Sequence, residues 1–86
     1  HAIAAQVDRL VVTDSEVLLI DYKTNRPPPR RAADVDPAYL FQMAVYRAAL
    51  QRIYPGREVR CMLLWTDGPF ILELLPAQLD AALTVL

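Results

Sequence analysis

Two aspartates and a lysine lie near the ends of two strand-like segments that a short polar break joins. Residues 2–13 and the apolar run 17–20 are typical of strands, and Asp14-Ser15 between them is typical of a two-residue turn. With that turn, all cross-strand pairs have the same index sum, so Asp8 falls opposite Asp21. A three-residue turn would shift the register by one and separate the two acids.

The expected arrangement places two carboxylates and an amine on one face. Alternation puts Asp21 and Lys23 on the same side of the strand, and side chains opposite each other across an antiparallel pair have Cβ atoms about 4.5–5.5 Å apart. Such close carboxylates need a shared proton, the Lys23 ammonium or a divalent cation. Carboxylate oxygens suit Mg²⁺ or Mn²⁺, and this chemistry hydrolyses phosphodiesters. The alternative is a cross-strand ion pair at a solvated strand end.

A predicted helix supplies a second group of polar side chains. It runs over 37–54, because Asp36-Pro37 is a typical helix start and Pro55-Gly56 a typical stop. Helical spacing puts Gln42 on one face with Tyr39, Tyr46, Ala49 and Ile53, while the opposite edge carries Arg47, Gln51 and Arg52. A glutamine and tyrosines directed at the acids could hold a substrate phosphate or the attacking water. The alternative is a core stripe of tyrosines with one tolerated glutamine.

A basic, proline-stiffened loop follows the proposed acid cluster directly. It contains Arg26, Arg30 and Arg31 after Lys23, no acid, and three consecutive prolines at 27–29. Such a loop beside a metal site is a plausible track for a DNA backbone. The alternative is a solvated loop whose charge serves solubility.

The remaining segments complete an α/β (α+β) order of β-β-α-β-β-α. We expect strands over 57–65 and 70–75, with Asp67-Gly68 as a turn between them, and a final helix from Pro76. The 70–75 strand is expected at a sheet edge, since Pro69 cannot donate a ladder hydrogen bond. The apolar run 17–20 is expected to be covered on both faces. A last stripe of apolar residues, Leu79, Ala82, Leu83 and Leu86, should dock this helix.

Composition bounds the class of protein. Eighty-six residues make one small domain, and the 55% apolar content exceeds that of an average soluble domain. We expect part of the apolar surface to lie against a missing part of a longer chain. The single cysteine, Cys61, excludes an internal disulfide and an iron–sulfur cluster built within this segment, and it reads as a small core residue. The lack of an internal disulfide suits a reducing cytoplasm, and no apolar run reaches the length of a membrane span, so we expect a soluble, cytoplasmic protein.

Three motifs in order resemble a known nuclease branch. Asp8, then Asp21-Tyr22-Lys23 after an apolar strand, then Gln42 and Tyr46 in Gln-x-x-x-Tyr spacing are similar to the RecB-type PD-(D/E)xK nucleases. The resemblance implies a restriction-endonuclease-like core truncated at its N-terminal side, with residues 1–86 as a single partial nuclease domain. It also implies Mg²⁺ or Mn²⁺ held by Asp8, Asp21 and the Tyr22 carbonyl, a catalytic Lys23, and assistance from Gln42 and Tyr46.

The runs at 21–29 and 63–68 are similar to the C-terminal nuclease end of AddA-type helicase–nuclease subunits. This implies an exonuclease-type activity on single-stranded DNA during double-strand break repair, with AddB as partner and the helicase motor elsewhere in the chain. The family's further metal ligand, a His or Glu on an upstream helix, is expected outside these residues, so the segment alone is expected to cut DNA poorly. The alternatives are a stand-alone RecB-like exonuclease and a nuclease-like module that has lost catalysis.

Overall fold

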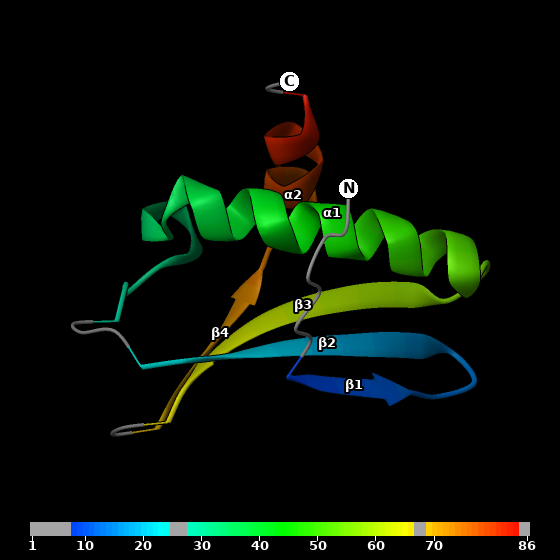
Figure 1. Ribbon diagram of the computed structural model, residues 1–86, viewed down its shortest axis with the longest axis horizontal. Helices are drawn as coiled ribbons and strands as arrows, with labels where there is room; N and C mark the ends of the chain where they lie inside the picture. Colours follow the sequence, from blue (N-terminus) through cyan, green and yellow to red (C-terminus); the bar gives the residue numbers. More distant parts are fainter. Residues whose placement is uncertain (1–7, 25–27, 67–68, 85–86) are drawn as a thin grey trace.

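The computed structural model describes residues 8–24, 28–66 and 69–84. The predicted order of elements is confirmed (Figure 1). The elements are β1 (Arg9–Val12), β2 (Glu16–Lys23), the 3-10 turn η1 (Ala32–Asp34), α1 (Pro37–Ile53), β3 (Glu58–Trp65), β4 (Phe70–Leu74) and α2 (Pro76–Leu83). The turn η1 is an addition within the predicted loop. The turn expected at 67–68 and the basic residue Arg26 lie outside the described residues.

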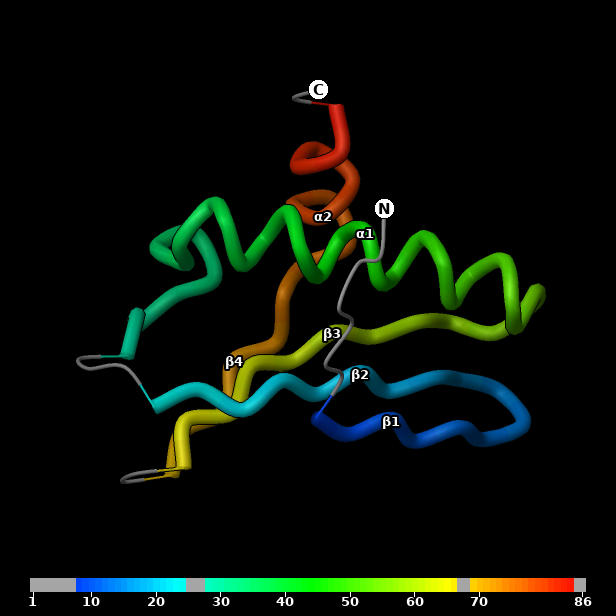
Figure 2. Tube along the Cα trace, viewed as in Figure 1, coloured from blue at the N-terminus to red at the C-terminus, as the bar shows by residue number. Residues whose placement is uncertain are grey.

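The four strands form one sheet in the order β1-β2-β3-β4. The β1–β2 and β3–β4 pairs are antiparallel, whereas β2 and β3 are parallel. A parallel pair needs a crossover, and α1 supplies it, as the path of the chain in Figure 2 shows. In the described part of the chain β4 is the last strand of the order, so its predicted edge position is confirmed.

The hairpin register agrees with the two-residue turn at Asp14-Ser15. Arg9 pairs with Ile20 and Val12 with Val17, so the index sum is the one predicted from the sequence. The Thr13 amide donates to the carbonyl of Glu16 (2.9 Å) and closes the turn. In the described part of the chain this strand begins at Arg9, and residues 2–7 of the expected strand lie outside that part.

The core lies between the sheet and the helices, on a single side of the sheet. Every second residue of β2 and β3 points into it, and α1 and α2 close it from above (Figure 1). Its strand members are Val17, Leu19, Val59, Cys61, Leu63, Trp65 and Leu74; its helical members are Met43, Ala44, Tyr46, Leu50 and Leu79. Cys61 is fully buried, as predicted, and Leu79 docks α2 with the partly buried Ala82 and Leu83. Leu86 lies outside the described residues.

The expectation that β2 is covered on both faces was wrong. Val17 and Leu19 are buried, but Leu18 and Ile20 between them are only half-buried and Tyr22 is 42% exposed. Both helices of the described chain lie on the same side of the sheet, so its other side carries apolar side chains that no helix covers in that part of the chain. There Arg60 pairs with Glu73 (2.7 Å) and lies near Glu16 (3.6 Å).

Helix α1 starts as predicted but buries a different face. The Asp36 carboxylate accepts a hydrogen bond from the Ala38 amide (2.9 Å), and Pro37 occupies the first turn. Ile53 is 64% exposed and Ala49 is also exposed, so the predicted face was wrong at these positions. The expected polar edge was also wrong at Arg47, which turns toward α2 and pairs with Asp80 (2.7 Å). Neither helix in the described ranges has the length and apolarity needed to cross a bilayer.

Candidate active site

The structure brings Asp8 and Asp21 together at the end of the β1–β2 hairpin. Asp8 precedes β1 by one residue, and the Tyr22 amide donates a 2.8 Å hydrogen bond to its Oδ2 atom. The Asp21 side chain is only 15% exposed, because it points to the helix-covered side of the sheet. This backbone contact from β2 holds the Asp8 carboxylate beside Asp21, although Asp8 itself is exposed.

Their pKa values move in opposite directions. The pKa of Asp8 lies below its ordinary value, because its carboxylate accepts hydrogen bonds from the Asp21 carboxyl and then from the Tyr22 amide. The pKa of Asp21 is raised, first by burial and then by its hydrogen bond with Asp8. Asp21 therefore keeps its proton to a higher pH than an ordinary aspartate, and when it is protonated it can donate a hydrogen bond to Asp8.

Lys23 completes the cluster from the same face of β2. Its Nζ atom lies 2.7 Å from Asp21 Oδ2, and only 13% of its side chain is exposed. The ammonium also lies 3.7 Å from the centre of the Tyr39 ring of α1, a cation–π contact. Of the three compensations considered for the acids, the amine is therefore present. The Tyr39 ring fixes the position of the amine on the side away from the strand.

Gln42 and Tyr46 form a pair on α1, one and two turns beyond Tyr39. The Gln42 amide donates a 3.1 Å hydrogen bond to the hydroxyl of Tyr46, a residue that is only 7% exposed. Its helical position suggested that Gln42 lies among apolar neighbours, but the residue is exposed. The amide nitrogen is instead anchored by the buried tyrosine.

The basic loop is only partly assembled as a cationic track. Arg31 donates hydrogen bonds of 3.3 and 3.4 Å to the Asp34 carboxylate, so its charge is paired with an acid three residues away. Arg30 is exposed and has no partner within the described part of the chain. The contact that ties Tyr22 to the acids is its amide rather than its carbonyl. The metal-ligand role of that carbonyl stays a prediction, as do the DNA-binding roles of the arginines.

The donor set fits a hydrated divalent cation with few protein ligands. Asp8 and Asp21 are neighbouring carboxylates that perturb each other's pKa, and they offer the hard oxygen ligands that Mg²⁺ and Mn²⁺ prefer. The described ranges contain no group of three or more His, Cys, Asp or Glu side chains placed to hold a metal. A cation at this pair would therefore keep several of its own waters.

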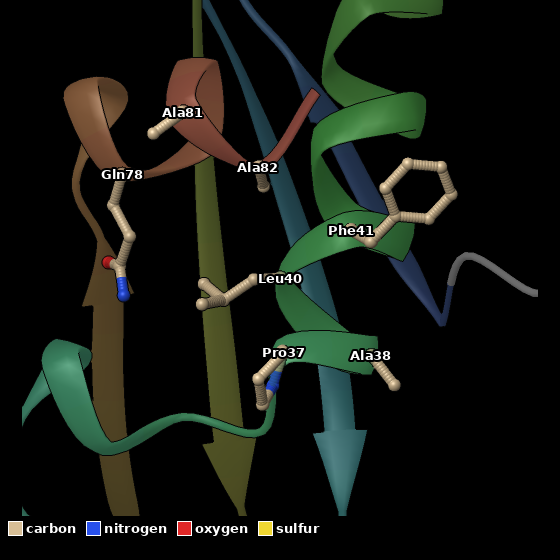
Figure 3. Close-up of a pocket in the computed structure, with 7 residues that line it drawn as sticks. All are labelled: Pro37, Ala38, Leu40, Phe41, Gln78, Ala81 and Ala82. Atoms are coloured by element: carbon tan, nitrogen blue, oxygen red, sulfur yellow. The ribbon is translucent and has the colours of Figure 1, made fainter. Parts of the chain in front are cut away.

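Two cavities open near α1, and they differ in character. The larger, about 620 Å³, is an apolar groove between α1 and α2 whose walls carry no ionisable side chain (Figure 3). The smaller, about 360 Å³, lies on the side of Lys23 and Tyr39. We call it the Tyr39–Trp65 pocket; its lining residues are Pro28, Pro29, Arg30, Asp34, Asp36, Tyr39 and Trp65.

Trp65 is the residue of this region that sequence reasoning missed. It pairs with Lys23 across the parallel strands β2 and β3, and its ring packs on Phe70 with centroids 6.1 Å apart. Local spacing along the chain did not predict a place beside the lysine for it. The signal lies in the parallel register, which pairs residues 42 positions apart in the sequence and cannot be obtained from local patterns.

The comparisons with known proteins identify one family. The model of the PD-(D/E)XK nuclease superfamily matches residues 1–78 of the chain. No curated protein and no solved structure gives a significant match.

Proposed function

This chain belongs to the PD-(D/E)XK nuclease superfamily, and from that premise we propose that it is the metal-dependent DNA nuclease domain of an AddA-type helicase–nuclease subunit. The superfamily indicates a nuclease, and its members generally use divalent metals. The finer assignment is an exonuclease-type activity on single strands released by a helicase, during the processing of double-strand breaks for recombinational repair. In that role AddB is the partner subunit and the cytoplasm is the compartment.

The single observation that carries the proposal is the convergence of Asp8, Asp21 and Lys23. In a plain surface ion pair, a second carboxylate would be free to move away from the first. Here the Tyr22 amide fixes Asp8 next to an acid whose pKa burial already raises. Such an arrangement is costly for the metal-free fold and is typical of a functional site.

Each side chain has a distinct role in the proposed reaction. Asp8 and Asp21 would hold Mg²⁺ or Mn²⁺, with the Tyr22 carbonyl as an additional ligand. When bound, the cation supplies positive charge to the phosphate and makes a water more acidic. Lys23, held by Asp21 and Tyr39, orients the attacking water and stabilises negative charge on the phosphate. Gln42, anchored on Tyr46, contacts a phosphate oxygen or the same water.

The test is cleavage of a labelled single-stranded oligonucleotide in Mg²⁺ by the full-length protein that contains this segment and by its Asp21→Asn variant. We expect the variant to fall to the background rate, because it loses a charged ligand while keeping the shape of the side chain. Asp34→Asn serves as the matched control, since it changes an exposed aspartate whose partner is Arg31. Equal turnover by the protein and Asp21→Asn would overturn the proposal.

The rival assignment is a nuclease-like module without catalysis that assembles with other subunits. The retained acids and lysine favour the enzyme. Calorimetric titration with Mn²⁺ distinguishes the two: heats that depend on Asp8 support a metal site, and identical, flat heats from the protein and its Asp8→Ala variant favour the module. A Mn²⁺-dependent cleavage product from strands without a free end would instead argue against the exonuclease type.

A further inference from the structure

The Tyr39–Trp65 pocket adjoins the proposed catalytic cluster but has no role in the chemistry above. Tyr39 connects the two, because its ring contacts the Lys23 ammonium and also lines the pocket. Trp65 pairs with Lys23 across the parallel strands β2 and β3 and is only 2% exposed. A ligand in the pocket would thus lie directly beside the site where a phosphate is cut.

The pocket has the size and the surfaces that suit a flat, partly apolar group. Its volume of about 360 Å³ lies at the lower end of the ~300–1,000 Å³ that small-molecule sites occupy. Pro28, Pro29 and the ring of Tyr39 line it with apolar surface, together with the almost fully buried Trp65. Proline rings and aromatic rings offer flat faces to a planar group, and nucleobases stack on aromatic side chains regardless of their identity.

The charges at the rim disfavour a phosphate inside the pocket. Asp34 is already bound to Arg31, and the Asp36 carboxylate caps α1 through one oxygen. Its second oxygen has no partner in the described part of the chain, so it is available to accept a hydrogen bond. Two carboxylates repel a phosphate but can accept from the N–H groups of a base. Arg30 also lines the pocket, is exposed and has no partner in the described part of the chain, so it is available to a backbone phosphate.

We propose that the Tyr39–Trp65 pocket is a nucleobase subsite, which receives the base of the nucleotide next to the phosphate bound at Asp8 and Asp21. This inference rests on the nuclease function proposed above. A base and its own phosphate are joined through one sugar, and the pocket and the acid cluster are joined through Lys23 and Tyr39. Arg30 holds the next phosphate of the same strand.

The experiment compares two octamers by fluorescence anisotropy in EDTA, one of deoxycytidine and one of abasic sugar-phosphate units. The two carry the same phosphates, so their affinity ratio measures the contribution of the bases. We expect the protein to bind the deoxycytidine octamer about tenfold more tightly, within the range for a base stacked on an aromatic side chain. A ratio below about twofold in the unchanged protein overturns the subsite without the use of any variant.

Variants locate the base contribution. Tyr39→Leu should reduce the ratio toward one, whereas Tyr39→Phe should preserve it because the ring remains. Phe41→Leu is the matched control, since Phe41 lies on the same helix but lines the α1–α2 groove. Arg30→Gln should weaken both octamers by the same factor. A ratio that survives Tyr39→Leu in a protein with a native circular dichroism spectrum overturns the assignment to this pocket.

The two proposals fail in different ways. Because binding is measured without divalent cations, its outcome does not depend on hydrolysis. Cleavage of DNA with a base ratio near one overturns the subsite alone. A retained, Tyr39-dependent ratio without any Mg²⁺-dependent cleavage overturns the nuclease proposal alone.

Discussion

Replacing Asp21 by asparagine should make the metal-free protein more stable while it removes the response to metal. The pKa of Asp21 is raised above its ordinary value of 3.8, mainly by burial. Between 3.8 and the raised pKa the folded protein binds more protons than the unfolded chain, so stability falls as the pH rises through that window. Asparagine keeps the neutral form at every pH and avoids this loss. The raised pKa is a net effect that already includes the opposing influence of Lys23.

The size of the effect follows from the geometry of the pair. A favourable cross-strand pair contributes roughly 0.2–1 kcal/mol, and like charges directly opposite each other are destabilising; we take the same order of magnitude for the acid pair. For Asp21, whose side chain is 15% exposed, we expect a gain of about 0.5 kcal/mol at pH 7 in EDTA. In a domain of this size that is a rise in Tm of about 3 °C. The advantage should shrink as the pH falls toward the ordinary value of 3.8.

Calorimetric melting with and without Mn²⁺ supplies the assay. At a free Mn²⁺ concentration ten times the Kd, the unchanged protein should gain about 1.4 kcal/mol, and the asparagine variant should gain little. Asp34→Asn is again the control, because its carboxylate is 47% exposed and lies outside the acid cluster. The reasoning is refuted if Asp21→Asn is less stable than the parent in EDTA at pH 7, or if Mn²⁺ raises the Tm of both equally.

Three further outcomes follow from the packing. Leu19→Ala, at a side chain 1% exposed, should cost about 2–5 kcal/mol in urea unfolding, whereas Ile71→Ala, 61% exposed, should cost about 0.5 kcal/mol or less; equal costs would contradict the one-sided core. Burial raises the pKa of the Cys61 thiol to about 11, so a disulfide reagent at pH 8 should modify it only after unfolding, and rapid labelling of the native protein would refute that burial. Asp36→Ala should cost about 1 kcal/mol by thermal melting through loss of the helix cap, while Asp36→Asn should cost almost nothing; similar losses in both would show that the cap does not act.

The hairpin and its acid pair were predictable because their determinants are local. A two-residue turn fixes the register of its strands, and the register fixes which side chains face each other. The alternation of β2 then places Asp21 and Lys23 on one face. The start of α1 was predictable for the same reason, since Asp36 and Pro37 act on their own helix.

The face of α1 was not predictable, because the helix is apolar on more than one side. Spacing shows that Tyr46 and Ile53 share a side, but tertiary packing decides how far that side turns toward the sheet. In the folded protein Met43, Tyr46 and Leu50 are buried, whereas Ile53 is exposed to solvent. Arg47 turned inward because α2 brings Asp80 within reach, and nothing in the sequence of α1 indicates that partner.

The covering of β2 and the fate of Arg31 depend on information beyond the motif. A continuous apolar run predicts two covered faces, yet both helices of the described chain pack on one of them. Arg31 looked like part of a basic loop, but η1 places Asp34 three residues away in position to bind it. A count of charges along the loop does not anticipate such local neutralisation.

The turn at Asp14-Ser15 has a consequence for how this gene tolerates change in length. Gain or loss of one codon there would change no residue of the acid cluster. It would nevertheless shift the register of β1 against β2 by one residue, which moves the side chains of β1 to the opposite face of the sheet. Asp8 would then point away from Asp21, with no substitution at either aspartate. A dipeptide without any chemistry of its own therefore sets whether the two carboxylates can act as a unit.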